Sequence, residues 1–167
     1  EGEGHKTLET VSYIIAELIK AGADRHSYLL GFGGGIVTDI TGFVASIFMR
    51  GVSFGFVSTT LLSQVDASVG GKNGVNFEGY KNMVGVFNQP DFVICDPLSF
   101  RTLPRPDYVA GFSEIIKAAM IKDAALFEYL ESHVMEALSM DAEVMNHLVA
   151  SSVKIKAGVV QQDEREQ

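Results

Sequence analysis

Cysteine, positive charge and uninterrupted apolar sequence are all scarce in this chain. One cysteine, Cys95, can form neither an internal disulfide nor a Cys-x-x-Cys motif, which favours a reducing, cytoplasmic setting. Lys and Arg number 13 against 21 Asp and Glu, a net charge of −8 without any basic cluster, so we expect no nucleic-acid partner. The apolar stretch 36–48 is interrupted by Asp39 and two threonines. It is shorter than the roughly 18 residues that indicate a membrane span, so we expect no membrane partner.

The composition that remains is that of a folded protein. Hydrophobic residues make up 47% and charged residues 20% of the 167, enough apolar side chains for one ordinary domain or two small ones. The chain begins with Glu1 rather than Met and stops in the charged run 163–167, which no capping signal closes. We therefore expect a fragment of a longer protein.

Hydrophobic periodicity divides the chain into an α/β part and a helical part. The pattern predicts a helix over 7–20 that stops at Gly22, a strand over 27–31, and a second helix over 36–49 with Asp39 in its first turn. It also predicts strands over 52–58 and 92–95, and helices over 107–120, 124–139 and 142–160. We therefore expect two domains, 1–101 and 102–167.

The segment 31–39 places four glycines between a predicted strand and a predicted helix. Such a turn lets backbone N–H groups approach a pyrophosphate at the positive end of the helix dipole. The spacing matches neither G-x-G-x-x-G nor a P-loop. A tight structural turn is the alternative interpretation.

A second polar segment, 66–76, carries an aspartate, a lysine, glycines and amides, and Lys81 and Asn82 follow it. These residues lie outside any periodic segment, where we expect a loop. Lysines among amides favour a phosphorylated and hydroxylated ligand. A solvated surface loop is the alternative.

Glu114 and Lys117 are three residues apart on a predicted helix and share a face, so an ordinary ion pair would explain them. The apolar sequence around them favours burial, where an acidic residue needs a metal or another cation. The four histidines show no paired spacing, so a complete metal site is not evident. Ordinary structural roles would also explain four other polar residues. Arg50 suits the C-cap of a helix, Thr59 and Thr60 suit a turn, and Lys156 suits a solvated helix face.

Seven segments together resemble one family. They are GGGIVTD at 33–39, RG at 50–51, STTLLSQVDASVGGK at 58–72, KN at 81–82, TLP at 102–104, GFSEIIK at 111–117 and DERE at 163–166. Each is weak alone, but in this order and spacing the chain is similar to 3-dehydroquinate synthase, of the sugar phosphate cyclase superfamily.

The resemblance implies a Rossmann-like nucleotide-binding part followed by an α-helical domain, with the site in the cleft between them. It implies a lyase of the shikimate pathway to chorismate and the aromatic amino acids, a cytoplasmic homodimer. This lyase converts 3-deoxy-D-arabino-heptulosonate 7-phosphate to 3-dehydroquinate and phosphate, using NAD and a divalent metal, zinc or cobalt. NAD oxidises a ring hydroxyl, phosphate is eliminated, and the ketone is reduced again.

The resemblance also assigns roles position by position. It implies cofactor contacts for Gly33, Gly34, Gly35, Asp39, Thr59, Thr60, Lys81, Thr102, Glu3 and Lys6. It implies substrate contacts for Asp66, Lys72, Asn82, Lys117 and Lys156, and for Arg50 reaching from a neighbouring subunit. Glu114 resembles the acidic metal ligand.

Three departures from the family pattern qualify these expectations. The family's two histidine ligands fall beyond Gln167, its first strands fall before Glu1, and Tyr80 stands where a glycine often precedes the lysine. We therefore expect little activity from the 167 residues alone. Another sugar phosphate cyclase, such as a 2-deoxy-scyllo-inosose or 2-epi-5-epi-valiolone synthase, remains open, as do a polyol dehydrogenase of related fold and a catalytically inactive remnant.

Overall fold

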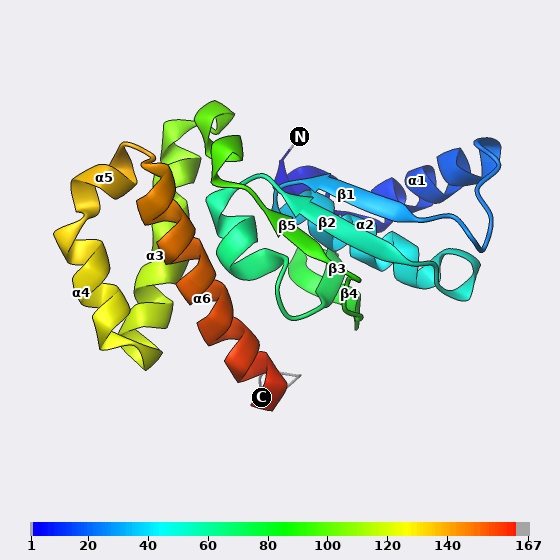
Figure 1. The fold of residues 1–167 in the computed structure, drawn as a ribbon. Helices are drawn as coiled ribbons and strands as arrows, with labels where there is room; N and C mark the ends of the chain where they lie inside the picture. The colour runs from blue at the N-terminus through cyan, green and yellow to red at the C-terminus, as the bar shows by residue number, and fades with distance from the viewer. Residues whose placement is uncertain (1, 163–167) are drawn as a thin grey trace.

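The computed structural model describes residues 2–162, so the DERE match at 163–166 lies outside the described residues. Two parts are visible in Figure 1: a strand-containing part with helices α1 and α2, and a cluster formed by helices α3 to α6. The expected fold class, an α/β part followed by an α-helical part, is confirmed.

The elements follow one another in a simple order. The first part contains η1 (Glu3–His5), α1 (Leu8–Lys20), β1 (Leu29–Gly33), α2 (Gly35–Ile47), η2 (Phe48–Arg50), β2 (Phe54–Ser58), η3 (Ser63–Ala67), β3 (Lys72–Phe77), β4 (Tyr80–Phe87) and β5 (Val93–Cys95). The second contains η4 (Pro97–Thr102), α3 (Arg105–Lys122), α4 (Ala124–Ser132), α5 (Val134–Leu138) and α6 (Ala142–Gln162).

A three-stranded parallel sheet in the order β1-β2-β5 forms the centre of the first part. On β2, Phe54 and Phe56 are buried in a cluster with side chains of α1 and α2, so these helices cover one face of the sheet. Side chains alternate between the faces of a strand. Leu30 and Phe32 on β1 and Ile94 on β5 accordingly remain about half or more exposed on the sheet.

The polar segment after β2 is not the loop that its composition predicts, because much of it forms an antiparallel hairpin of β3 and β4. Hydrophobic alternation could not reveal this hairpin. Gly74 lies opposite Gly85, and a Cβ at Gly85 would stand 2.2 Å from the Asn73 carbonyl oxygen. The two backbones approach so closely here that only glycine fits.

Two further expectations are corrected. Asp39 lies beyond the first turn of α2, because the helix already begins at Gly35. The helix expected over 124–139 is two helices, α4 and α5, which meet at His133 in a non-helical conformation. The break turns α5 so that Ala137 is fully buried and its carbonyl meets a side chain of α3.

The two parts share a core. Leu61 and Val65, which follow β2, are buried in the same cluster as residues of α3 and α6. The segment after β2 therefore connects the sheet to the helices. Within residues 2–162, no helix has both the length and the apolar character needed to cross a membrane.

Tyr108 allows a test of this helical core. Its side chain is fully buried, and its hydroxyl donates a hydrogen bond of 2.6 Å to the Ala137 carbonyl. Burial raises the pKa of Tyr108 from an ordinary value of 10.0 to about 12. Ionisation therefore favours the unfolded chain, and this contribution to stability is present below pH 10 and lost as pH rises to about 12.

We expect Tyr108→Phe to lower the free energy of unfolding near neutral pH by about 1 kcal/mol, because the Ala137 carbonyl loses one of its two donors and keeps only the Met140 N–H. The variant should also lose the part of the stability decline between pH 10 and 12 that Tyr108 causes. Urea denaturation across this pH range measures both effects. Tyr13→Phe, at an exposed tyrosine, is the control. Equal pH dependence in both variants would contradict the assignment.

Candidate functional site

The turn from β1 into α2 consists of Gly33, Gly34 and Gly35. Gly34 is the N-cap, and a Cβ there would stand 2.9 Å from the Thr60 methyl carbon. The turn therefore needs glycine for packing, as the structural interpretation proposed. The same turn also exposes the start of a helix, where backbone N–H groups lack intrahelical partners and attract anions.

A cavity of about 790 Å³ opens at this turn, and we call it the glycine-turn cavity. Gly34, Gly35 and Asp39 line it from α2, Glu3 and Lys6 from the N-terminal segment. Residues of the helical part also contribute, so the cavity lies where the two parts meet: Leu103, Asp107 and Ala110.

Thr59 and Thr60 hold the end of β2 beside this turn. The Thr59 N–H donates to the Gly33 carbonyl oxygen at 2.9 Å. Thr60 Oγ1 accepts from the Ser63 N–H at 3.1 Å, which is the turn-forming role that its position suggests, and Thr60 also lines the glycine-turn cavity. The two roles are therefore combined in one residue.

A second cavity, of about 480 Å³, adjoins the first, and we call it the lysine cavity. Five residues singled out in the sequence line it: Asp39, Asp66, Lys72, Asn82 and Lys156. Asp39 lines both cavities, so the two share a wall. Ligands in the two cavities would therefore both lie beside Asp39.

Asp39 forms an ion pair with Lys6, and both side chains are nearly buried, at 15% and 6% exposed. Removal from water raises the pKa of the Asp39 carboxyl, and the Lys6 ammonium opposes that rise. Lys6 Nζ also donates to Asn82 Oδ1 at 2.5 Å. One buried cation thus connects α2 to the β3–β4 hairpin.

Asp66 and Lys156 form the second ion pair of the site. Asp66 lies on η3, a π-helical turn, and Lys156 on α6, 90 residues further along the chain. π-Helical turns of this kind frequently occur at functional sites. The pair joins the sheet part to the helical part at the wall of the lysine cavity.

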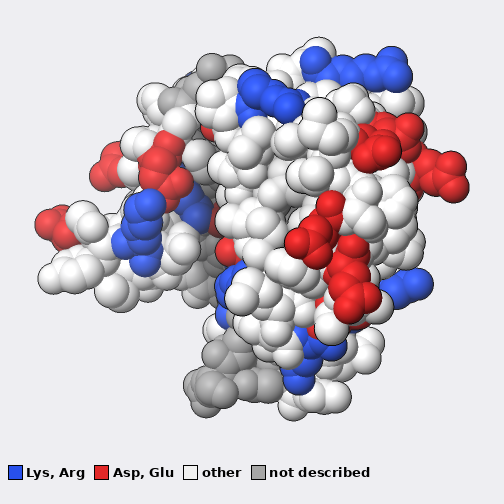
Figure 2. Space-filling view, turned by 90° about the vertical axis from the view of Figure 1, so that its left-hand side faces the viewer, with Lys and Arg blue, Asp and Glu red and all other residues white. Residues whose placement is uncertain are grey.

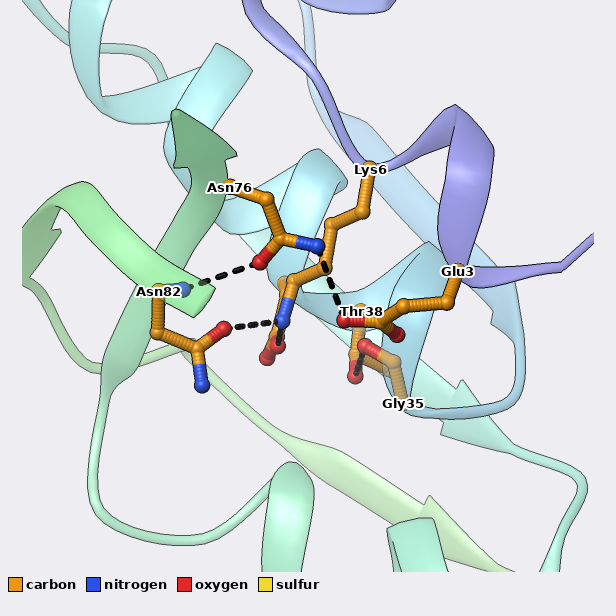
Figure 3. A network of polar contacts seen from close by, with 7 residues as sticks. Glu3, Lys6, Gly35, Thr38, Asn76 and Asn82 are labelled. Carbon is orange, nitrogen blue, oxygen red and sulfur yellow. Dashed lines mark hydrogen bonds and ion pairs between the residues drawn. The ribbon is translucent and has the colours of Figure 1, made fainter. Parts of the chain in front are cut away.

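A third group of contacts links Glu3, Asn76 and Asn82, as Figure 3 shows. Asn76 Nδ2 donates to Glu3 Oε1 at 2.8 Å, and the Asn82 N–H donates to Asn76 Oδ1 at 2.9 Å. Sequence reasoning included Asn76 in the polar segment but gave it no role. Its position in the sequence between Lys72 and Lys81 was the only available signal.

The remaining predicted residues line neither cavity. They are Gly33, Arg50, Thr59, Lys81, Thr102, Glu114 and Lys117. Arg50 is exposed and has a positive φ of 69°. Lys81 is exposed on β4, and Thr102 at the end of η4.

Glu114 and Lys117 form the i,i+3 ion pair, with 3.1 Å between Nζ and Oε2. Glu114 is partly buried, while Lys117 is exposed. Among residues 2–162, no three His, Cys, Asp or Glu side chains gather closely enough to hold a metal ion. The described donors therefore do not form a metal site, whereas the glycine turn fits a nucleotide phosphate.

Basic side chains do not gather on the face in Figure 2, where the Lys and Arg residues are scattered among neutral and acidic areas.

Two family models match the chain. The model described as 3-dehydroquinate synthase N-terminal matches residues 1–110, and the one described as 3-dehydroquinate synthase C-terminal matches residues 111–167. A 3-dehydroquinate synthase of Solibacter usitatus is 47% identical over 165 residues, and that of Sulfurovum sp. is 51% identical over 166. Each alignment covers 99% of this chain and 46% of the relative, so the chain spans about half the length of these relatives.

Solved structures show the same fold. A 2-epi-5-epi-valiolone synthase from Streptomyces hygroscopicus with NAD⁺ and Zn²⁺ bound has a TM-score of 0.94 and 30% identity. A 2-deoxy-scyllo-inosose synthase complexed with carbaglucose-6-phosphate, NAD⁺ and Co²⁺ has a TM-score of 0.92 and 28% identity. Both alignments cover 100% of this chain, and 47% and 46% of the respective neighbours.

We expect Lys6→Met to lower the free energy of unfolding near neutral pH by about 3 kcal/mol, because it leaves the Asp39 carboxylate buried without its cation. The loss should shrink as pH falls, since protonation of Asp39, whose pKa is already raised, removes the unpaired charge. Urea denaturation near pH 7 and pH 5 measures this. Lys20→Met, which breaks the exposed pair with Glu17, is the control and should cost under about 0.5 kcal/mol. Equal losses of stability in the two variants would show that the Lys6–Asp39 pair contributes no more than an exposed ion pair.

Proposed function

The chain belongs to the 3-dehydroquinate synthase family, and on that premise we propose that it supplies cofactor- and substrate-binding walls of a 3-dehydroquinate synthase. The proposed reaction converts 3-deoxy-D-arabino-heptulosonate 7-phosphate to 3-dehydroquinate and phosphate, a step of the shikimate pathway. The proposed cofactor, NAD, supplies the reversible removal of a hydride from the substrate.

One observation carries the proposal: the glycine-turn cavity and the lysine cavity share the wall at Asp39. Hydride transfer requires that the cofactor and the substrate carbon be held in contact. A site for a pyrophosphate beside a site for a phosphorylated sugar acid provides this arrangement. A solvated surface loop, the alternative interpretation, would not place Lys72 and Lys156 in a cavity beside the glycine-turn cavity.

The chain's own residues have distinct proposed tasks. The backbone of Gly34 and Gly35 at the start of α2 binds the cofactor pyrophosphate, and Thr60 lies beside it. Lys72 and Lys156 bind anionic groups of the substrate, because ammonium groups are strong partners of phosphate. Asp66 orients the Lys156 ammonium through their ion pair. These tasks are positioning and electrostatic stabilisation.

A divalent metal is part of the proposal only through the family and its neighbours, which contain Zn²⁺ or Co²⁺. Glu114 is the one proposed ligand in this chain. Because a catalytic zinc has three protein ligands as a rule and residues 2–162 offer no such group, no step of the reaction is assigned to the metal.

Three further proposals follow from family membership. The predicted division at residues 101 and 102 separates a nucleotide-binding domain from a helical domain, and the family models meet slightly later, at 110 and 111. The proposed active form is a cytoplasmic homodimer. Arg50, exposed at the end of η2, is proposed to reach the neighbouring subunit's substrate.

A second candidate is another sugar phosphate cyclase. The neighbour solved with carbaglucose-6-phosphate has the same fold at 28% identity, below the 44–51% of the 3-dehydroquinate synthases. A panel of phosphorylated sugars would separate the candidates. Turnover of a hexose 6-phosphate, with none of the heptulosonate phosphate, would reassign the chain.

We expect Lys72→Ala to reduce phosphate release from the heptulosonate phosphate about 100-fold or more, because it removes a cation from the lysine cavity. The assay uses the complete product of the reading frame that encodes this chain and measures inorganic phosphate. Lys122→Ala, at an exposed lysine near the end of α3, is the control and should retain full activity. Full activity in Lys72→Ala would contradict the proposed role.

We expect Gly34→Ala to weaken NAD⁺ binding about ten-fold or more, because the added methyl group meets Thr60 and displaces the start of α2. Isothermal titration calorimetry of the same protein measures the dissociation constant. Gly158→Ala is the matched control, since a Cβ at this helical glycine meets no atom within 4 Å. Unchanged NAD⁺ affinity in Gly34→Ala would place the cofactor elsewhere.

A further inference from the structure

The β3–β4 ladder is irregular opposite Asn76. Val75 pairs with Val84 and Phe77 pairs with Tyr80, so a single residue of β3 lies opposite residues 81–83 of β4. Asn82 adopts a positive φ of 52°, a conformation that asparagine tolerates better than most residues. Its N–H donates to Asn76 Oδ1 at 2.9 Å. The Asn76 side chain thus supplies a bond within the bulge.

Asn76 also holds the N-terminal segment. Its backbone N–H donates to the Lys6 carbonyl oxygen at 2.8 Å, and its Nδ2 donates to Glu3 Oε1 at 2.8 Å. In Figure 3, Asn76 accordingly lies between Asn82 on one side and Glu3 on the other. One residue therefore makes three hydrogen bonds to two segments that are far apart in the sequence.

These contacts close into a ring. Asn82 Oδ1 accepts from Lys6 Nζ at 2.5 Å, and Lys6 also pairs with Asp39 on α2. A shift of Asn76 would therefore move both the backbone that carries the Lys6 ammonium and the amide that receives it. Rings of polar contacts of this kind fix side chains more firmly than isolated bonds.

We propose that Asn76 is a positioning residue that sets the walls of both cavities. It lines neither cavity itself, but Glu3 and Lys6 line the glycine-turn cavity, and Asn82 lines the lysine cavity. This proposal rests on the proposed function for the identity of the two ligands, NAD⁺ and a phosphorylated sugar acid. Asn76 touches neither ligand and acts through Glu3, Lys6 and Asn82.

A swap of donor and acceptor tests this role. Asn76→Asp keeps an oxygen that can accept the Asn82 N–H, but it replaces the donor to Glu3 and sets two carboxylates against each other. Adding Glu3→Gln restores a donor that faces the carboxylate introduced at position 76. The set comprises wild type, Asn76→Asp, Glu3→Gln and the double variant, each as the complete product of the reading frame.

NAD⁺ dissociation constants from calorimetry give the readout. We expect Asn76→Asp to raise the constant about five-fold or more in the wild-type background, and less than about two-fold in the Glu3→Gln background. Asn146→Asp, at an exposed asparagine of α6, makes the same charge change and should have no effect. Equal losses in both backgrounds, or no loss in either, would overturn the proposal. Partial unfolding would instead lower the number of binding sites at an unchanged dissociation constant.

Hydrogen exchange of the ligand-free protein separates this proposal from the proposed function. We expect Asn76→Ala to speed exchange of the Asn82 amide about ten-fold or more, because that N–H loses its acceptor, while amides of α6 stay unchanged. A wild-type protein that binds no NAD⁺ overturns the proposed function, and faster exchange at Asn82 still supports the positioning of the bulge by Asn76. Unchanged exchange at Asn82 overturns that positioning whatever NAD⁺ does.

Discussion

The buried ion pair between Lys6 and Asp39 is the interaction on which the site depends. A charged group removed from water is costly unless it is paired and hydrogen-bonded, so the buried Lys6 can stay in place only while Asp39 and Asn82 surround it. Each partner belongs to a different element: the N-terminal segment, α2 and β4. The requirement to neutralise one ammonium therefore fixes three elements around the wall that the two cavities share.

The second constraint is the connection between the sheet and the helices. The chain leaves β2 through a buried segment whose Leu61 and Val65 pack into the helical core, and the π-helical turn of η3 then carries Asp66 to Lys156. Gln64, on the same turn, is fully buried and donates to the Ser58 and Asp96 carbonyl oxygens, at the ends of β2 and β5. Apolar packing and these amide bonds hold the turn in place, so that Asp66 meets α6 at a defined point.

Periodicity predicts α1 well, because its amphipathic pattern and the terminating glycine agree with the observed Leu8–Lys20, although Thr7, expected inside the helix, is its N-cap. It cannot predict the β3–β4 hairpin, since the close approach at Gly74 and Gly85 and the bonds of Asn76 leave no hydrophobic pattern. The resemblance named most of the charged residues that line the two cavities. It did not indicate Asn76. This residue touches no ligand, and its role comes from three hydrogen bonds around a bulge.

The net negative charge of the chain opposes binding of the proposed ligands, because both are anions. A net charge of −8 repels a pyrophosphate and a phosphorylated acid at long range, yet charges further apart than about 8 Å are largely screened at physiological salt. Local groups therefore decide binding: the N-terminal N–H groups of α2 and the ammonium groups of Lys72 and Lys156. The carboxylates of Asp39 and Asp66 hold two of the site's ammonium groups, those of Lys6 and Lys156, in place before any ligand arrives. Anion binding then needs little reorganisation of the protein, which is the condition under which electrostatic stabilisation is strongest.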